Sequence, residues 1–311
     1  MVRSKILVTG PTGVVGRRLV PLLVEEGHSV VAMTHGSGNR GAIERMGAVP
    51  VDADFLNGGS LRRAVAGCEA VVNLATHMPE SSTQMIRRSA WRENDVIRSL
   101  GSSNLVDAAL AEGVGRFVQE SFAPVYPDGG NHWIDESVAL RPVAYNGSIL
   151  DAEASAKRFT KAGGVGVVLR FAAFYGPDSR FLIEAIGQFR KNGRAFYPGS
   201  PDAFVSSVHH HDAATASAAA LRLPAGAYNV ADDEPVPRLE YFATLARALG
   251  LPPPKPFSWW AKLLMGSLGE MLSRSLRISN RRIKAASNWT PRYRSVREGW
   301  TSVAAALPAA A

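Results

Sequence analysis

Three glycines with regular spacing are the first residues here that suggest chemistry. Gly10, Gly13 and Gly16 lie in the segment "VTGPTGVVG", between a short apolar run and a stretch with helical spacing. We predict a tight turn from a strand into a helix. Glycine lets such a turn approach a pyrophosphate, and the free N–H groups at the helix start attract the anion. The pattern therefore predicts a dinucleotide site, and the alternative is a strand–helix turn without a ligand.

The segments that must position this turn alternate between strand and helix through the first half of the chain. Short apolar runs predict strands within residues 5–10, 28–34, 48–54, 69–76 and 116–122, and helical spacing predicts helices within residues 13–27, within 59–67 and in a long stretch ending near 115. This alternation predicts a doubly wound α/β fold, in which helices cover both faces of a parallel Rossmann sheet.

The alternation ends near residue 175, after which Pro, Gly and aromatic residues become more frequent. We therefore predict a dinucleotide-binding domain over residues 1–175 and a smaller substrate-binding lobe over 176–203 and 233–311. Residues 226–232, "GAYNVAD", resemble a late strand that returns to the sheet. Segments near 204–232 are accordingly assigned to the first domain, so that the two lobes interleave.

Composition excludes several classes of protein. The formal charge is +8, but we find no zinc-finger spacing and no alternation of aromatic with basic residues, so we do not expect nucleic-acid binding. We predict no signal peptide, membrane span or metal site. The single Cys68 excludes an internal disulfide and favours the reducing cytoplasm. We expect a monomer or a homodimer that acts on a small molecule.

The glycine spacing, preceded by Thr9, resembles the fingerprint of the extended short-chain dehydrogenase/reductase superfamily. The resemblance covers nearly the whole chain and is closest to the NAD(P)-dependent epimerase/dehydratase group. It rests on ordered elements that include "SFAPVY", "LRFAAFYGPDS", "VSSVHHHDAATA", "GAYNVADDEPV" and "NWTPRY". The residues that it implies for coenzyme binding are Gly10, Thr12, Gly13, Val14, Val15, Gly16, His35, Arg40, Asp54, Phe55, Leu74, Ala75, Thr76, Phe171 and Ala172. Of these, Asp54 corresponds to the residue that meets the adenine amino group.

The end of the second predicted strand bears on which dinucleotide binds. A carboxylate there would bind the ribose 2′-hydroxyl of NAD. Thr34 stands at that position, and His35 and Arg40 follow it. A 2′-phosphate needs donors and positive charge, so we predict NADP(H) in preference to NAD(H). The alternative is that His35 and Arg40 lie free in solvent.

In the chemistry that the resemblance implies, a tyrosine transfers a proton to or from the substrate oxygen. A lysine four residues later lowers the tyrosine pKa, and a Ser or Thr binds the reacting oxygen. Tyr145 matches the tyrosine, but Ile149 stands at the lysine position. Phe122 stands at the Ser/Thr position, four residues before Tyr126. Ser121 is one residue early and should point to the opposite face of its strand.

These departures leave three functions open. The first, which we favour, is an NADP(H)-linked oxidoreductase or epimerase/dehydratase-like enzyme in which Tyr145 is the remaining proton donor. The second is a redox-neutral isomerase or cyclase that keeps the coenzyme fold. The third is a non-catalytic NADP-binding sensor or scaffold. Lys157 and Lys161 lie too far along the predicted helix to replace the missing lysine.

Several other residues are candidates for the substrate side. We expect His77, Met78, Phe122, Ile149 and Arg180 to face the substrate. The carboxylates Glu120, Asp135 and Glu136 lie near the expected pocket, and for Glu136 a structural contact is the preferred interpretation. If residues 209–211, "HHH", continue a strand, only His209 and His211 share a face, and a structural role is favoured over a metal site.

Residues 257–276, "FSWWAKLLMGSLGEMLSRSL", have apolar side chains at helical spacing: Trp260, Leu264, Leu268 and Leu272. Three interpretations stay open: a core-facing helix of the small lobe, a lid over an apolar substrate, or a helix on a membrane surface. Because Phe122 and Ile149 are apolar too, we predict a small, fairly apolar carbonyl or hydroxyl compound rather than a sugar nucleotide.

Overall fold

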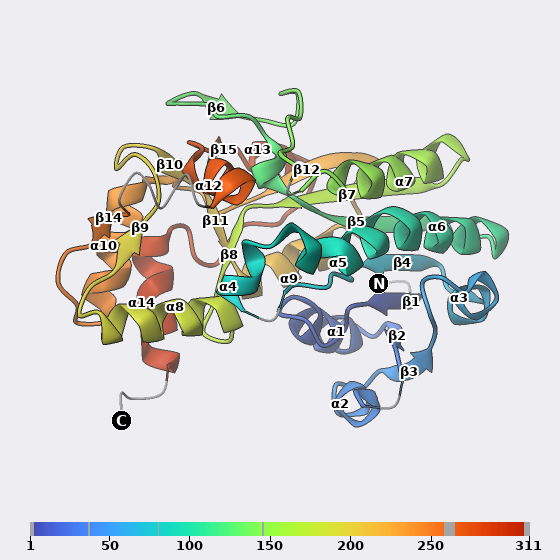
Figure 1. Ribbon diagram of the computed structural model, residues 1–311. Coiled ribbons are helices and arrows are strands. Elements are labelled where there is room, and N and C mark those ends of the chain that lie inside the picture. Colours follow the sequence, from blue (N-terminus) through green and yellow to red (C-terminus); the bar gives the residue numbers. More distant parts are fainter. Residues whose placement is uncertain (1–2, 37, 80, 145, 258–264, 308–311) are drawn as a thin grey trace.

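The computed structural model describes residues 3–36, 38–79, 81–144, 146–257 and 265–307 (Figure 1). Its centre is a seven-stranded sheet in the order β12-β7-β5-β4-β1-β2-β3, with every neighbouring pair parallel. The strands are β1 Lys5–Thr9, β2 Ser29–Thr34, β3 Val49–Asp52, β4 Ala70–Asn73, β5 Arg116–Phe122, β7 Val165–Phe171 and β12 Gly226–Val230. The predicted doubly wound α/β fold is confirmed.

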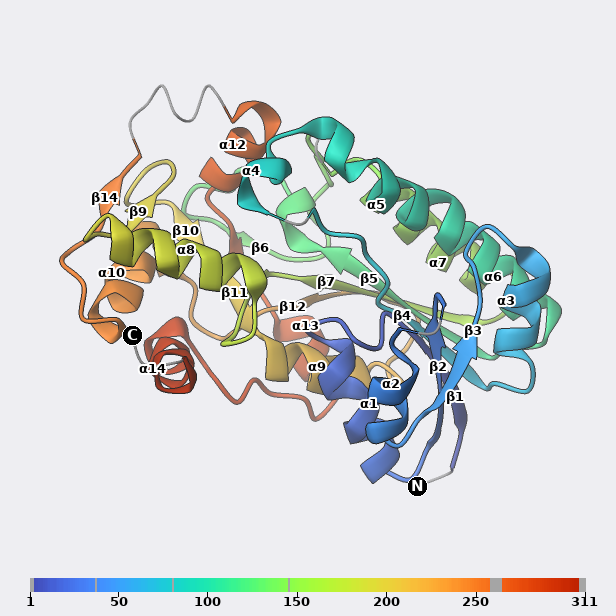
Figure 2. The same cartoon turned by 60° about the horizontal axis from the view of Figure 1, so that its bottom comes forward.

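Helices cover both faces of this sheet, as Figure 2 shows. On one face lie α3 (Gly58–Val65), α6 (Ser102–Ala111) and α7 (Ile149–Lys161), and on the other lie α1 (Gly16–Glu25) and α9 (His210–Ala219). Strand alternation explains the two cores. In β1, Leu7 packs with the first group, whereas Ile6 and Val8 pack with the second. The sheet is therefore buried on both faces, which is why its strands are continuously apolar.

Shorter elements connect the sheet to its helices. They are α2 (Arg40–Arg45), α4 (Ser82–Met85), η1 (Arg88–Trp91), α5 (Arg92–Val96), the π-helical turn η2 (Ile97–Gly101) and η3 (Ala123–Val125). The helical stretch predicted to end near 115 is thus formed by α5, η2 and α6 in succession, and the π turn widens it in the middle.

The C-terminal part is built on helices and short strand pairs, which gather on the left of Figure 1. The helices are α8 (Arg180–Lys191), α10 (Arg238–Ala248), α12 (Gly266–Ser273), α13 (Arg281–Ala286) and α14 (Val296–Ala306). The pairs are β8 (Ala173–Tyr175) with β11 (Ser207–His209), β10 (Phe204–Val205) with β13 (Val236–Pro237), β9 (Phe196–Tyr197) with β14 (Lys255–Pro256), and β6 (Trp133–Ile134) with β15 (Arg277–Ile278). An apolar cluster around Tyr175, Tyr241 and Trp300 joins α8, α10 and α14. We propose that this cluster is the core of the predicted smaller lobe.

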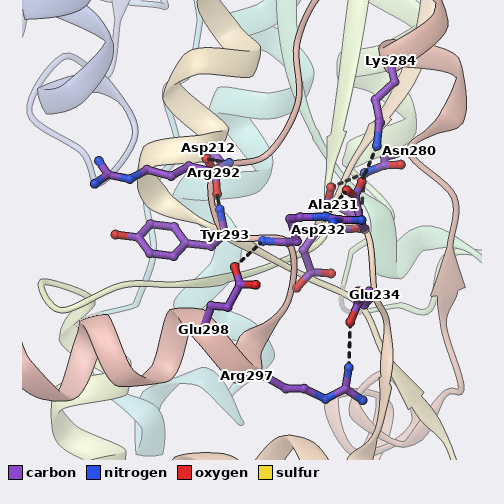
Figure 3. A network of polar contacts seen from close by, with 12 residues as sticks. Asp212, Ala231, Asp232, Glu234, Asn280, Lys284, Arg292, Tyr293, Arg297 and Glu298 are labelled. Carbon is purple, nitrogen blue, oxygen red and sulfur yellow. Dashed lines mark hydrogen bonds and ion pairs between the residues drawn. The ribbon is translucent and has the colours of Figure 1, made fainter.

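The late strand predicted at 226–232 does return to the sheet, because β12 pairs with β7 at its edge. A polar network then joins the segments after β12 to the C-terminal chain (Figure 3). Asn280 donates to the carbonyl of Ala231 at 2.8 Å, and Arg297 binds Glu234 at 2.7 Å. The carboxylate of Asp212 accepts the backbone N–H groups of Arg292 and Tyr293. These bonds hold the last helices against the sheet domain.

The segment predicted as an amphipathic helix over 257–276 is helical within α12. Leu268 is buried with Trp91, Val143 and Met271, which supports the core-facing interpretation, but Leu272 is 39% exposed. Trp260 and Leu264 lie outside the described residues. Among the helices that the structure describes, none is both long and apolar enough to cross a membrane.

Candidate functional site

The glycine turn packs too closely for larger side chains at two of its positions. Gly10 has φ +63°, and a Cβ there would lie 2.8 Å from the carbonyl oxygen of Leu74 on the neighbouring chain segment. A Cβ on Gly16 would lie 2.1 Å from the carbonyl oxygen of Gly10. The turn closes with a 3.1 Å bond from Gly13 N to Gly10 O. Glycine is therefore required at positions 10 and 16 by close backbone approach.

The start of α1 leaves donors for an anion. Val15 is the N-cap residue, no side chain caps the helix, and none of the residues in its first turn is acidic. Gly13 is exposed, whereas Thr12 and Val14 are half-buried. The first N–H groups of the helix and the positive end of its dipole consequently face the exposed turn. This arrangement fits a diphosphate.

A buried polar network, which the sequence analysis did not identify, aligns the carboxyl ends of β1, β4 and β5. The hydroxyl of Thr9 donates to Asn73 at 2.6 Å and accepts the backbone N–H groups of Leu74 and Ala75 at 3.2 Å. Asn73 in turn donates to Gln119 at 2.9 Å. The only signal in the sequence is the polar residues inside two apolar runs. The network fixes the strand ends where the predicted coenzyme segment Leu74–Thr76 begins.

The predicted adenosine side lies on exposed loops at the ends of β2 and β3. His35 and Arg40 are exposed, and Thr34 is buried. Asp54 is also exposed, and its carboxylate accepts the N–H of Leu56 at 2.9 Å. Asp52, which the sequence analysis did not name, accepts the N–H of Gly36 at 2.9 Å and so braces the loop after β2.

The remaining predicted coenzyme residues differ in accessibility. Phe55 is half-buried against Gly101, and Thr76 is exposed next to half-buried Ala75. Phe171 and Ala172 are 0% exposed within the core, so neither offers surface to a ligand in this structure.

The hydroxyl at the end of β5 belongs to a buried network on the α7 side. Ser121 donates to Glu153 at 2.7 Å, and Glu153 forms two hydrogen bonds with Arg170, at 2.8 and 2.7 Å. Arg170 also donates to the hydroxyl of Tyr126 at 2.7 Å, and Tyr126 donates to Asn229. Burial raises the pKa of Tyr126 to about 12, although Arg170 acts in the opposite direction. Both hydroxyls are hydrogen-bonded, and both residues are 0% exposed.

Apolar side chains occupy the two positions beside this network. Phe122 packs against a cluster formed by Trp91, Val143, Leu268 and Met271. Ile149 is the first residue of α7 and is 0% exposed. Tyr145 lies outside the described residues. Lys157 and Lys161 are exposed farther along α7.

The carboxylates named from the sequence have different surroundings. Glu120 forms a buried ion pair with Arg98 of the π turn at 2.8 Å. Glu136 accepts the N–H of Asn229 at 2.7 Å, which supports the structural contact preferred for it, and burial raises its pKa. Asp135 is exposed and bonds to Ser137.

The triple histidine lies at a junction between a strand and a helix, so its predicted geometry on a strand is wrong. β11 ends at His209 and α9 begins at His210, because His209 serves as the N-cap and accepts the N–H of His211 at 3.2 Å. His210 instead contacts Asp178, with 2.8 Å between its Nδ1 and the carboxylate. Within the described residues, no three His, Cys, Asp or Glu side chains lie close enough together to hold a metal ion.

The predicted substrate residues at the rim are exposed. His77 lies 3.3 Å from Glu93, and its backbone N–H donates to Asn94 at 3.0 Å. Met78 is 41% exposed, and Arg180 at the start of α8 is exposed as well.

Two cavities lie away from the glycine turn. One of about 400 Å³ lies at the amino ends of the strands, where Ile6, His28 and Arg116 line it. The other, of about 600 Å³, lies between α1, α9 and residues 286–292. None of the predicted coenzyme or substrate residues lines either cavity. The candidate site is therefore identified by the geometry of the turn and of the strand ends.

Comparisons with known proteins identify a family and related enzymes. A family model described as the NAD dependent epimerase/dehydratase family matches residues 6–231, a range that contains the turn and all the strand ends. Over 312 residues the chain is 30% identical to the 3-diazoavenalumate denitrifying reductase of a Streptomyces species, and the match covers 95% of this chain and 98% of the relative. It is 26% identical to the 2-alkyl-3-oxoalkanoate reductase of Stenotrophomonas maltophilia, over 88% of this chain and 84% of that protein.

A solved structure shares the fold. DesIV, a dTDP-glucose 4,6-dehydratase from Streptomyces venezuelae with NAD and TYD bound, matches with a TM-score of 0.78 at 21% identity. The match covers 97% of this chain and 96% of that one. This likeness extends to the whole arrangement of sheet and C-terminal part.

Proposed function

We propose that this chain is an NADP(H)-linked oxidoreductase for a small, fairly apolar substrate. The chain belongs to the NAD dependent epimerase/dehydratase family, and this membership is the starting point of the proposal. The observation that carries the proposal is the turn itself: Gly10 and Gly16 are held in close backbone contact at the uncapped start of α1. When bound there, the nicotinamide coenzyme supplies or accepts a hydride. The residues of the chain hold the diphosphate and align the ring with the substrate.

The preference for NADP(H) is supported by residue types at the end of β2. Thr34 offers no carboxylate to a ribose 2′-hydroxyl, and His35 and Arg40 are exposed where a 2′-phosphate needs donors. Asp52 is unfavourable for this preference, because its carboxylate would repel a 2′-phosphate. That carboxylate accepts a hydrogen bond from the N–H of Gly36. The similar DesIV structure holds NAD. Titration of the purified protein with NADPH and NADH in parallel decides the preference, and tighter binding of NADH would overturn it.

For a carbonyl or hydroxyl substrate, we propose that Tyr145 moves the proton. Ser121 and Tyr126 are engaged in the buried network, and the side chains of Phe122 and Ile149 have no exchangeable proton. The apolar cluster around Phe122 and Trp91 favours an aromatic or aliphatic group over a sugar nucleotide. Groups that assist proton transfer contribute about 10²- to 10⁴-fold to the reaction rate. A site that has Tyr145 but lacks the lysine and the serine would therefore be slow but active.

A second candidate is favoured by the same apolar residues. The relative with 30% identity is named as a denitrifying reductase of a diazo compound. An aryldiazonium ion that accepts a hydride and releases N₂ leaves an arene, so no oxyanion forms and no proton donor is needed. A site with Phe122 and Ile149 in place of polar groups suits that acceptor. The positive charge of a diazonium ion is also tolerated better where no lysine stands.

The experiment is a turnover assay that follows loss of the reduced-nicotinamide absorbance. A matched aryl aldehyde, aryl ketone and aryldiazonium salt serve as substrates. Consumption of NADPH with any of them supports an oxidoreductase, and the pattern selects the acceptor. Conversion of substrate without a net change in coenzyme would favour a redox-neutral isomerase or cyclase, and tight NADPH binding without any turnover would favour a sensor or scaffold.

The cytoplasmic location stays part of the proposal, and fractionation of cells tests it.

A further inference from the structure

The loop between β8 and α8 is joined to the coenzyme turn by one carboxylate. Asp178 lies on this loop, two residues before α8 begins. It accepts from Arg18 at 2.8 Å and lies 3.2 Å from Arg17, and both arginines are in the first turn of α1. His210, at the start of α9, lies 2.8 Å from the same carboxylate. Three positively charged or protonatable groups from two helices thus converge on Asp178.

The two arginines also bind the turn. Arg18 donates to the carbonyl of Val14 at 2.8 Å, and Arg17 donates to the carbonyl of Gly13 at 3.3 Å. Each guanidinium therefore bridges a backbone carbonyl of the glycine turn and the carboxylate of Asp178. In Figure 1, α8 lies to the left of α1 in the lower part of the molecule.

The loop is packed closely on its other side. A Cβ on Gly176 would lie 2.2 Å from Nδ1 of His210, and the rings of Phe174 and His210 are 6.0 Å apart with an edge-on geometry. Although partial burial opposes it, hydrogen bonds from His210 and Arg18 hold the pKa of Asp178 well below its usual range. Asp178 is therefore ionised at neutral pH, and its position is determined on three sides.

Charge explains why a carboxylate is needed here. Two arginines at the amino end of a helix are unfavourable, because the helix dipole is positive at that end. Asp178 compensates this charge and turns both guanidinium groups toward the carbonyls of the turn. Without it, Arg17 and Arg18 would extend into solvent and the turn would lose two of its supports.

We propose that Asp178 is a positioning residue, which braces the coenzyme turn through Arg17 and Arg18 and thereby couples coenzyme binding to the placement of α8. The inference rests on the proposed coenzyme site. It also bears on the substrate side, because the predicted substrate residue Arg180 begins α8. Loss of the carboxylate weakens the diphosphate site and releases α8 from it.

The test is NADPH binding to the full chain, which needs no knowledge of the substrate. We expect Asp178→Ala to raise the NADPH dissociation constant about tenfold, the effect of one charge-assisted hydrogen bond. Asp178→Glu, which keeps the charge, should restore most of the affinity. The matched control is Glu112→Ala, which removes a carboxylate that binds exposed Arg62 at 2.9 Å, far along the chain from the turn. It should leave the dissociation constant unchanged.

Two further measurements separate positioning from a general loss of stability. In an Arg17→Met/Arg18→Met background, the change Asp178→Ala should have less than a twofold further effect, because its route to the turn is already absent. Hydrogen exchange within residues 180–186 should slow when NADPH binds the wild-type protein, but not when it binds Asp178→Ala. Equal NADPH affinity in wild-type protein and folded Asp178→Ala overturns this inference alone. Failure of the wild-type protein to bind either coenzyme overturns the proposed function instead.

Discussion

Ser121 donates a 2.7 Å hydrogen bond to Glu153, and the neighbouring Phe122 packs into an apolar cluster with Trp91 and Met271. The strand thus directs its hydroxyl toward α7 and its aromatic ring toward the C-terminal part. Because Glu153 is buried and pairs with Arg170, turning the hydroxyl away would remove one hydrogen bond from a buried carboxylate. The end of β5 therefore presents a hydrocarbon surface where the family resemblance implies a hydroxyl.

The first prediction concerns the two apolar positions. The double change Phe122→Ser and Ile149→Lys should raise reduction of an aryl ketone at least about tenfold, because it supplies a hydroxyl and a cation at the two positions where the family resemblance implies them. Stability should fall, since position 149 is 0% exposed and burial of an ammonium group is costly. The assay is ketone-dependent NADPH consumption together with a thermal melt. Leu150→Lys is the control: it adds the same charge at a 39% exposed neighbour and should change neither quantity appreciably.

The second prediction distinguishes the two candidate acceptors. Tyr145→Phe removes only a hydroxyl. If a carbonyl is reduced and Tyr145 donates the proton, kcat should fall by about 10²- to 10⁴-fold. For an aryldiazonium acceptor, kcat should not change, because no oxyanion forms. Steady-state kinetics with both acceptors decide the matter, and an unchanged rate with the carbonyl removes Tyr145 from the mechanism.

The third prediction concerns the glycine turn. Gly16→Ala should abolish coenzyme binding, since the added methyl would lie 2.1 Å from the carbonyl oxygen of Gly10. Isothermal titration with NADPH measures the loss. The matched control is Gly187→Ala within α8, where nothing lies within 4 Å of the added Cβ. That variant should bind normally and gain about 0.5 to 1 kcal/mol in unfolding free energy. Normal binding by Gly16→Ala would exclude the turn as the diphosphate site.

The fourth prediction concerns the exposed arginine after β2. Arg40→Ala should raise the dissociation constant of NADPH about tenfold and leave that of NADH unchanged, because only NADPH carries the 2′-phosphate. Arg45→Ala removes a second exposed arginine from the same helix α2 and is the control. Equal effects on the two coenzymes would show that Arg40 does not read the phosphate.

The fifth prediction follows from the buried His209. Burial lowers its pKa to about 3, below the value of about 6.5 for an unfolded chain. Between these two values the unfolded state binds a proton that the folded state does not. The unfolding free energy should therefore fall as pH decreases from about 6.5 toward 3, by at most about 1.4 kcal/mol per pH unit from this residue.

The variant His209→Asn isolates this contribution. Asparagine keeps an acceptor for the N–H of His211 and removes the titration. Denaturant unfolding across that pH range should give a flatter slope for the variant than for the wild-type protein. Burial raises the pKa of the nearby Asp232, which changes stability in the opposite sense in both proteins and so cancels in the comparison. His132→Asn, at an exposed position, should leave the slope unchanged.

The sequence by itself determined the sheet, the turn and the residue types at the positions where the family resemblance implies proton-transfer groups. Apolar runs such as β4 have to be buried on both faces, and glycine at position 16 reflects a local backbone constraint, because a Cβ there would meet Gly10 and Pro11. These features depend on neighbouring residues only, so the pattern along the chain contains them. The opposite faces of Ser121 and Phe122 follow from strand alternation in the same way.

Only the tertiary structure decided which side chains meet across long separations. Asp178 reaches Arg18 over 160 residues, and Ser121 reaches Glu153 over 32. No local pattern marks either pair, because each contact depends on how helices pack against the sheet. The same holds for the histidines at 209–211: the strand ends at His209, and α9, which packs against α1, begins at His210. Residue types are local information, whereas partners are set by the packing of distant segments.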